Sequence, residues 1–318
     1  MKKILAAVII IIVLIFVAQG WWNSQLTPVS TDKEQKTIII AKGKSLSEIA
    51  NQLKKENLIR SEKVFIFYVK SQKLADKLSA GTFKITPSMS TQEVVKTLSG
   101  SPTETWVTLI EGWRVEEMAD KLNGELKIDK QQFLKIAKEG YMFPDTYLFP
   151  QDVTVEQIAK KLRDTFDKKY SDDLKAKIKL QSLTEAQGVI LASIVEREAR
   201  SDQARTAVAS ILLKRLKIGM GLNADATVQY ALGYQQEEKN WWKKNLSTDD
   251  LKINSPYNTY IHSGLPPAPI CNPSLSSLQA VANADSSTPY LYYYHDSKGN
   301  SYYGKTLEEH NANVTNNP

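Results

Sequence analysis

The strongest hydrophobic pattern in the chain lies at its N-terminus. Met-Lys-Lys precedes an apolar run over residues 4–18, and Trp21 and Trp22 follow shortly after it. Lysines on one side and tryptophans at the far interface are typical of a membrane helix whose N-terminus stays inside the cell. The pattern predicts a membrane anchor over residues 1–22, held in the membrane through residues 4–22. A cleaved signal peptide is the alternative that the sequence leaves open.

A small first module is predicted after this segment. Residues 23–36 are polar and are interpreted as a tether. Strands are expected over 37–40 and 81–85, because short apolar runs bounded by turn residues are typical of strands. Helical spacings of apolar residues between and after these strands each follow a serine of the kind that caps helices: Ser45, Ser61 and Ser90. The module, residues 37–103, is therefore predicted to have the order β-helix-helix-β, with one further short helix.

The remaining residues, 104–318, are predicted to form a larger α+β domain. A strand is expected over 105–110, and residues 141–147 are interpreted as an aromatic turn. The 3.6-residue period of the apolar positions predicts successive helices over 115–122, 130–138, 155–170, 183–200 and 203–218. Beyond Gly219 the chain is rich in loop-forming residues. Two strands and a helix are expected to end it, over 290–294, 301–303 and 307–314.

One of these helices places a carboxylate among apolar positions. A capping box at Ser182 and Glu185 is expected to begin the helix. At about 100° per residue, Glu198 lies on the apolar stripe of the helix and Glu196 on the opposite side. Glu196 and Arg200, one turn apart, are interpreted as a solvated surface ion pair. Glu198 is either an acid kept protonated for catalysis or a carboxylate at a fraying helix end, and the helix alone leaves both open.

Composition restricts the number of domains and the possible cofactors and partners. A chain of 318 residues with 42% hydrophobic residues can form about two domains. Its single cysteine, Cys271, excludes an intrachain disulfide and leaves no thiol pair for a metal site. The net charge of +6 arises from scattered residues, and no basic block is interleaved with aromatics. Nucleic acid is therefore not an expected partner.

Several catalytic schemes lack their residues in this sequence. The three histidines are widely spaced and no His-Glu-x-x-His helix occurs, which excludes the common zinc hydrolases. Ser-x-x-Lys occurs only in the tether, without the other motifs of penicillin-binding enzymes. A glycine fingerprint over 219–224 follows a helix instead of a strand, so no dinucleotide is expected. No cofactor or metal is predicted, and carboxylate chemistry remains.

A family resemblance is carried by a series of segments in a characteristic order. These segments are Glu-Gly-Trp-Arg at 111–114, residues 141–147, the helix segment Leu-Ala-Ser-Ile-Val-Glu-Arg-Glu at 191–198, residues 215–228, Ser-Pro-Tyr-Asn-Thr-Tyr at 255–260 and Gly-Leu-Pro-Pro at 264–267. Together they resemble the YceG-like (MltG) endolytic murein transglycosylases. The resemblance covers the chain from the apolar run to the terminal Glu-Glu-His-Asn. Residues 104–318 would then be a YceG-like catalytic domain, and residues 37–103 a LysM-like module.

The resemblance implies an enzyme of the bacterial cytoplasmic membrane. It would be single-pass, with its catalytic domain on the extracytoplasmic side, and it would cut nascent peptidoglycan glycan strands. The family's catalytic glutamate corresponds to Glu198. Glu198 would cleave between N-acetylmuramic acid and N-acetylglucosamine and leave 1,6-anhydro ends, a lytic reaction that terminates glycan elongation. Peptidoglycan synthases are candidate partners.

Supporting residues are expected downstream of Glu198. Asp225 either holds a sugar hydroxyl and orients Glu198, or caps the following helix. Thr227 lies in the same motif as Asp225. Tyr257, Asn258 and Tyr260 either line the glycan groove by stacking and hydrogen bonding or only shape a proline-bounded loop.

Two rival functions remain at this point. A hydrolytic muramidase would need a second carboxylate, for which Asp225 is the candidate, to activate water. A non-catalytic scaffold would bind peptidoglycan through the LysM-like module and leave Glu198 inert. The product end, anhydro or reducing, separates the two enzymes, and binding without cleavage would identify the scaffold.

Overall fold

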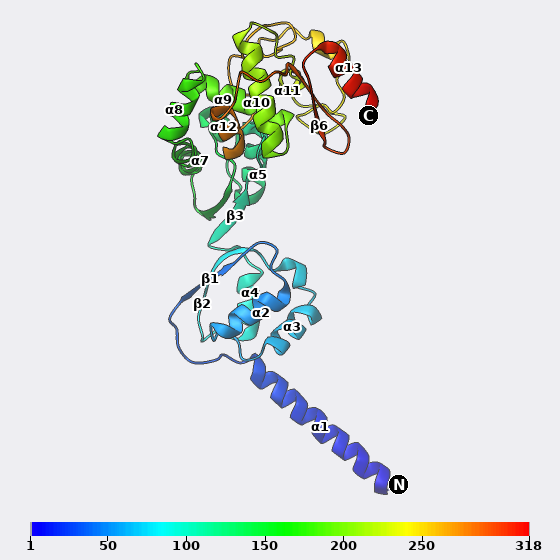
Figure 1. Ribbon diagram of the computed structural model, residues 1–318. Coiled ribbons are helices and arrows are strands. Elements are labelled where there is room, and N and C mark those ends of the chain that lie inside the picture. Colours follow the sequence, from blue (N-terminus) through cyan, green and yellow to red (C-terminus); the bar gives the residue numbers. More distant parts are fainter. Residues whose placement is uncertain (1, 318) are drawn as a thin grey trace. The chain divides into compact units, whose positions relative to one another are not determined.

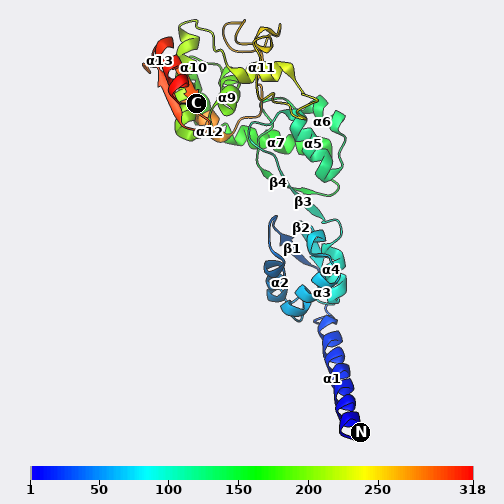
Figure 2. The ribbon, with the colours of Figure 1, turned by 90° about the vertical axis from the view of Figure 1, so that its right-hand side faces the viewer.

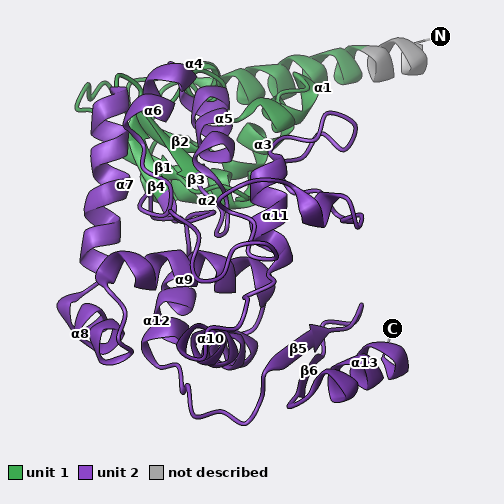
Figure 3. Ribbon diagram, turned by 90° about the horizontal axis from the view of Figure 1, so that it is seen from above, with its two compact units in different colours: residues 1–107, 147–153 green, residues 108–146, 154–318 purple. Residues whose placement is uncertain are grey.

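The computed structural model describes residues 2–317 as a mixed α/β structure with antiparallel sheets, in agreement with the predicted α+β class (Figure 1). Its packing defines two compact units (Figure 3). The first comprises Met1–Val107 and Tyr147–Val153, and the second comprises Thr108–Thr146 and Thr154–Pro318. The boundaries predicted from the sequence at 37–103 and 104–318 stay predictions.

The first unit begins with the apolar helix α1 (Lys2–Leu26). Its window Ile9–Leu26 is long and apolar enough to cross a membrane, although a signal sequence would meet the same criterion. The large apolar side chains over residues 9–17 are exposed. The helix extends beyond Trp22 into the segment predicted as a tether.

The rest of the first unit has the predicted β-helix-helix-β order. Its elements are β1 (Lys36–Ile40), α2 (Leu46–Lys55), α3 (Glu62–Ser71), the 3-10 turn η1 (Ala75–Lys77), β2 (Gly81–Ile85) and α4 (Thr91–Leu98). The three serine caps are confirmed, since each hydroxyl accepts a hydrogen bond from a backbone N–H of the first helical turn. Strands β3 (Glu104–Thr108) and β4 (Thr146–Pro150) complete a sheet of order β1-β2-β3-β4.

Close strand contact explains one glycine of this sheet. Gly81 has φ +144°, and a Cβ at this position would lie 2.2 Å from the carbonyl oxygen of Glu104. Strand β2 pairs antiparallel with β3 at this point, with Thr82 opposite Glu104. A side chain here would separate the strands.

The second unit is mainly helical and ends in a hairpin. Its helices are α5 (Val115–Leu126), α6 (Lys130–Ile136), α7 (Val155–Lys169), α8 (Asp172–Leu180), α9 (Glu185–Glu198), α10 (Asp202–Lys217), α11 (Asp225–Leu232), the 3-10 turn η2 (Asp250–Lys252), α12 (Leu275–Ala282) and α13 (Leu307–Asn316). Strands β5 (Tyr292–His295) and β6 (Ser301–Gly304) pair antiparallel, and α13 packs on both of them (Figure 2).

Several elements differ from the sequence prediction. Helices α8 and α12 were not expected, and the predicted aromatic turn ends within β4. Helix α12 is short and its turns contain serine and alanine, so its sequence has no strong apolar period. It is nevertheless buried, with Ser277, Leu278, Ala280 and Val281 inside the core. Tertiary packing therefore determines this helix more than local propensity does.

The core of the second unit surrounds helix α9. This helix packs against α8, α10, α11 and α12, and residues 188–195 are buried without exception. A helix segment that is buried on all sides has no single apolar stripe, so the stripe expected around Glu198 is part of a segment that is buried all round. Close packing against α8 explains Gly188, where a Cβ would lie 2.7 Å from Ile178 Cγ2.

Candidate active site

Helix α9 carries the candidate acid on its last residue. The helix begins with Thr184 as its N-cap, and Thr184 and Gln187 form the capping box. The prediction that Ser182 caps this helix is wrong. Ser182 lies in the preceding loop, where its backbone is left-handed (φ +66°). At the other end, Ala199 is extended (φ −137°) and stops the helix directly after Glu198. The Glu198 side chain therefore lies at the C-terminal end of α9, beyond its buried segment.

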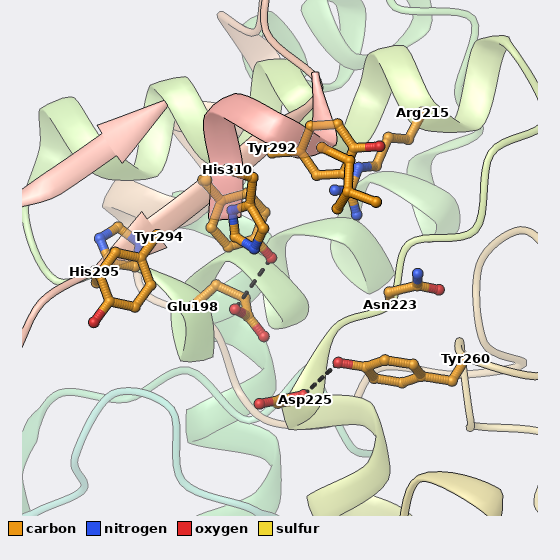
Figure 4. A pocket seen from close by; sticks show the side chains of 11 residues that line it. Glu198, Arg215, Asn223, Asp225, Tyr260, Tyr292, Tyr294, His295 and His310 are labelled. Carbon is orange, nitrogen blue, oxygen red and sulfur yellow. Dashed lines mark hydrogen bonds between the residues drawn. The ribbon is translucent and has the colours of Figure 1, made fainter. Parts of the chain in front are cut away.

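Two hydrogen bonds position the Glu198 carboxyl, and Figure 4 shows the one from a cavity side chain. The Tyr293 hydroxyl donates to Oε2 at 3.1 Å, and the Ala226 backbone N–H lies 3.5 Å from Oε1. Burial is the main cause that raises the pKa of Glu198 to about 7, and the negative charge of Asp225 adds to it. Both hydrogen bonds and the Arg197 charge act in the opposite direction. Near neutral pH both the protonated and the ionised form of the Glu198 carboxyl are therefore populated.

Glu196 differs from its predicted role. Its side chain is only 4% exposed and pairs with Arg205 at 3.2 Å, not with Arg200 in solvent. Its Oε2 also accepts hydrogen bonds from the Ser274 N–H at 2.8 Å and the Ser277 hydroxyl at 2.7 Å. Glu196 therefore joins α9, α10 and α12 as a structural residue. The two carboxylates of the Glu-x-Glu pair do lie in separate surroundings, as the helical angle predicted.

A cavity of about 500 Å³ opens at Glu198. Aromatic side chains form most of its wall, as Figure 4 shows. The lining residues are Glu198, Arg215, Asn223, Asp225, Tyr260, Tyr292, Tyr293, Tyr294, His295, Leu307 and His310. Aromatic faces with a few polar groups are suited to the apolar faces and hydroxyls of sugars.

Asp225 and Tyr260 lie together in this cavity. The Tyr260 hydroxyl donates to Asp225 Oδ1 at 2.6 Å. Asp225 is the first residue of α11, and the N-cap position belongs to Ala224, which has no capping side chain. The alternative in which Asp225 caps the helix is therefore wrong. A direct contact of Asp225 or Tyr260 with a substrate stays a prediction.

The other predicted binding residues lie behind the cavity wall. Thr227 is fully buried, and its hydroxyl bonds the Ala224 carbonyl and the Thr259 hydroxyl. Asn258 is also fully buried, and its amide nitrogen donates to two backbone carbonyls of the same loop. Tyr257 packs on the Tyr230 ring at 4.7 Å. These side chains hold the loop that presents Tyr260, and none of the three lines the cavity.

The sequence analysis did not identify Tyr293 or Arg215 as site residues. Arg215 is 6% exposed, and it donates to the carbonyls of Leu291 and Leu222 at 2.7 Å each. It thereby holds the hairpin and the segment before α11 beside α10. An arginine among the apolar positions of a predicted helix was the available signal. The Tyr293 hydroxyl had no comparable signal, because its partner lies 95 residues away.

A second hollow, of about 370 Å³, also reaches Glu198. It shares Glu198 and His295 with the aromatic cavity. The end of α9, the loop after it, the start of α10 and the tip of the β5–β6 hairpin provide the rest of its lining. Glu198 thus borders two adjoining spaces.

Metal and thiol chemistry have no visible site in the described part of the chain. Among residues 2–317, no three His, Cys, Asp or Glu side chains are grouped as a metal site would require. Cys271 is fully buried, its thiol donates to the Ser193 carbonyl at 3.2 Å, and burial raises its pKa. The thiol is therefore a core group.

Comparison with known proteins identifies the family of this chain. The model of the YceG-like family matches residues 38–316. An endolytic murein transglycosylase of Bacillus subtilis is 33% identical over 91% of this chain and 87% of its own length. One from Streptococcus pneumoniae is 28% identical over 91% of this chain and 60% of its own length. The crystal structure of a YceG-like protein from Listeria monocytogenes has a TM-score of 0.65, is 31% identical, and matches over 88% of this chain and 99% of that one. This chain belongs to the YceG-like family.

Proposed function

We propose that this protein is an endolytic peptidoglycan lytic transglycosylase and that Glu198 is its catalytic residue. The observation that carries the proposal is a carboxyl with a pKa of about 7 at the edge of an aromatic cavity. An acid with such a pKa can both donate and accept a proton near neutral pH. The names of the relatives support the same class of reaction.

The proposed reaction needs one carboxyl in two successive steps. Protonated Glu198 donates its proton to the β-1,4 oxygen between N-acetylmuramic acid and N-acetylglucosamine, and the C1–O bond breaks. The Glu198 carboxylate then takes the proton from the muramyl C6 hydroxyl as that oxygen bonds to C1. The products are a 1,6-anhydro-muramyl end and a free hydroxyl on N-acetylglucosamine, and the acid is regenerated.

The arrangement at Glu198 suits both steps. Burial favours the neutral acid, which the first step needs. Tyr293 and the Ala226 N–H favour the carboxylate that exists between the steps. Because Glu198 borders two hollows, a strand can extend on both sides of the cut, which supports internal over terminal cleavage.

A hydrolytic muramidase is the second candidate, because Asp225 lines the same cavity as Glu198. In that reaction the second carboxylate would activate a water molecule. The Tyr260 hydroxyl at 2.6 Å already occupies one Asp225 oxygen, which favours a positioning role for Asp225.

The location of the enzyme follows from α1 in this proposal. The helix would anchor the protein in the cytoplasmic membrane, with the second unit on the extracytoplasmic side beside newly made glycan. The β1–α2–α3–β2 module would act as a LysM-like glycan-binding element, and peptidoglycan synthases would be partners. Cleavage at this location would terminate glycan elongation.

Mass spectrometry of the soluble products tests the proposal. The protein and its Glu198→Gln variant are incubated with uncrosslinked glycan strands. We expect anhydro-muramyl ends from the wild type and a loss of at least about a thousandfold in the variant, because general acid catalysis and its reversal both depend on this group. Reducing ends would identify a muramidase, and equal turnover by the variant would exclude Glu198 as the acid.

A further inference from the structure

The hollow beside the aromatic cavity is distinguished by its charge. Arg197 and Arg200 line it, together with hydroxyl groups of Ser201 and Ser301. Asp296 is the acidic residue of its lining besides Glu198. The lining therefore combines two guanidinium groups with hydrogen-bonding groups next to the candidate acid.

The neighbouring acids are already engaged elsewhere. Asp296 accepts hydrogen bonds from the Lys298 and Asn300 backbone N–H groups, at 2.9 and 2.8 Å, within its own turn. Asp202, which begins α10, pairs with Arg205 at 3.1 Å. Among the described residues, Arg200 has no ion pair, and its side chain is exposed. The positive charge of Arg200 is thus available to a ligand.

Arg197 is held in place more firmly. Its guanidinium lies 3.8 Å from the centre of the Trp242 ring, a stacking contact. Its Nε is buried and has no hydrogen-bond partner within residues 2–317. Arg197 therefore adds a fixed positive charge to the hollow, whereas Arg200 can move to meet an incoming group.

The substrate of the proposed reaction carries a peptide with free carboxylates, and this peptide is attached near the cut. N-acetylmuramic acid bears a peptide on the lactyl group at C3, and the scissile bond is at C1 of the same sugar. When C1 is beside Glu198, the peptide must therefore leave the sugar close to this carboxyl. Peptide carboxylates match a guanidinium in charge and hydrogen-bonding geometry.

We propose that the Arg200 hollow is a binding site for a carboxylate of the peptide stem, so that the enzyme recognises the peptide as well as the sugar. This inference rests on the proposed function and specifies its substrate as peptide-bearing glycan. The volume of the hollow, about 370 Å³, lies within the range of small-ligand sites and is sufficient for a short peptide segment.

The test compares two substrates with one charge variant. Uncrosslinked strands are used with their peptides, and after an amidase has removed the peptides and the lactyl carboxylates that it frees have been converted to amides. The full-length protein is compared with Arg200→Gln. We expect the wild type to have a KM about tenfold lower for peptide-bearing strands, as one charged hydrogen-bonded contact would give. Arg200→Gln should lose this preference and leave the KM for bare strands unchanged, and Arg200→Lys should recover part of it.

Lys298→Gln is the matched control. Lys298 lies at the tip of the β5–β6 hairpin, close to the hollow, but it does not line the hollow. Its substitution by glutamine removes one positive charge, as Arg200→Gln does. A wild type without peptide preference would overturn the inference, as would equal effects of Arg200→Gln on both substrates. Glu198-dependent cleavage in these cases would leave the proposed function intact. Absence of cleavage of both substrates by the wild type would instead refute the proposed function, and the inference with it.

Discussion

The hydrogen bond from Tyr293 to Glu198 allows a quantitative prediction for Tyr293→Phe. The substitution keeps the ring and removes the donor that lies 3.1 Å from Oε2. Because this bond stabilises the carboxylate, its loss raises the pKa of Glu198. Hydrogen bonds to charged groups contribute roughly 1.5–3 kcal/mol. The distance is at the long end for an O–H donor, so the lower value applies.

The expected change follows from this energy. About 1.4 kcal/mol corresponds to one pKa unit, so the pKa of Glu198 should rise from about 7 to about 8. Since the acid must be protonated to begin the reaction, the alkaline limb of kcat against pH should move up by about one unit. The assay is the rate of anhydro-end formation between pH 5 and 9.5.

Tyr294→Phe is the control for this experiment. Tyr294 lines the same cavity, but within residues 2–317 its ring pairs with Tyr302 and it makes no hydrogen bond to Glu198. The alkaline limb of kcat against pH for Tyr294→Phe should coincide with that of the wild type. An unchanged or lowered limb in Tyr293→Phe would refute the assignment of Tyr293 as the group that positions and tunes the acid.

Two further predictions concern stability. The pKa of Glu198 is about 7 in the folded protein against an ordinary value of 4.5, so the folded state binds the extra proton between these values and loses stability as pH rises through this range. Relative to Glu198→Gln, whose amide does not titrate, the wild type should lose roughly 3 kcal/mol of unfolding free energy between pH 4 and 8, measured by urea denaturation; an identical pH dependence in both proteins would contradict this. Glu196→Ala should cost about 3 kcal/mol, because the mostly buried Arg205 would lose its buried partner and keep only the exposed Asp202. Asp164→Ala, which removes an exposed pair with Lys160, should cost under about 1 kcal/mol, and equal losses in the two variants would refute the structural role of Glu196.

Local patterns in the sequence were sufficient for much of the fold. The serine caps at 45, 61 and 90 and the β-helix-helix-β order were predictable, because capping and apolar periodicity act within a few residues. The position of Glu198 at the end of an apolar helix was visible for the same reason. Helix α12 was not visible, because its stability derives from burial against α9 and α10.

Contacts between distant segments limited the prediction of the site. The sequence predicted an ion pair between Glu196 and Arg200, because a helix pattern reveals only partners one turn away on the same helix. Its actual partners lie on α10 and α12, up to 81 residues away. Thr227 and Asn258 share their motifs with Asp225 and Tyr260, and only the folded chain separates buried supports from cavity residues.

The link between Glu198 and Tyr293 makes the site dependent on a segment that is synthesised well after the acid. The two residues are 95 positions apart, and Arg215 holds the hairpin through the carbonyl of Leu291. A chain that stops before β5 retains Glu198 and loses the hydroxyl that positions it, together with much of the aromatic wall. Translation proceeds from the N-terminus, so an unfinished chain would carry the acid without a complete site. The order of synthesis would thus protect the cell wall from incomplete copies of the enzyme.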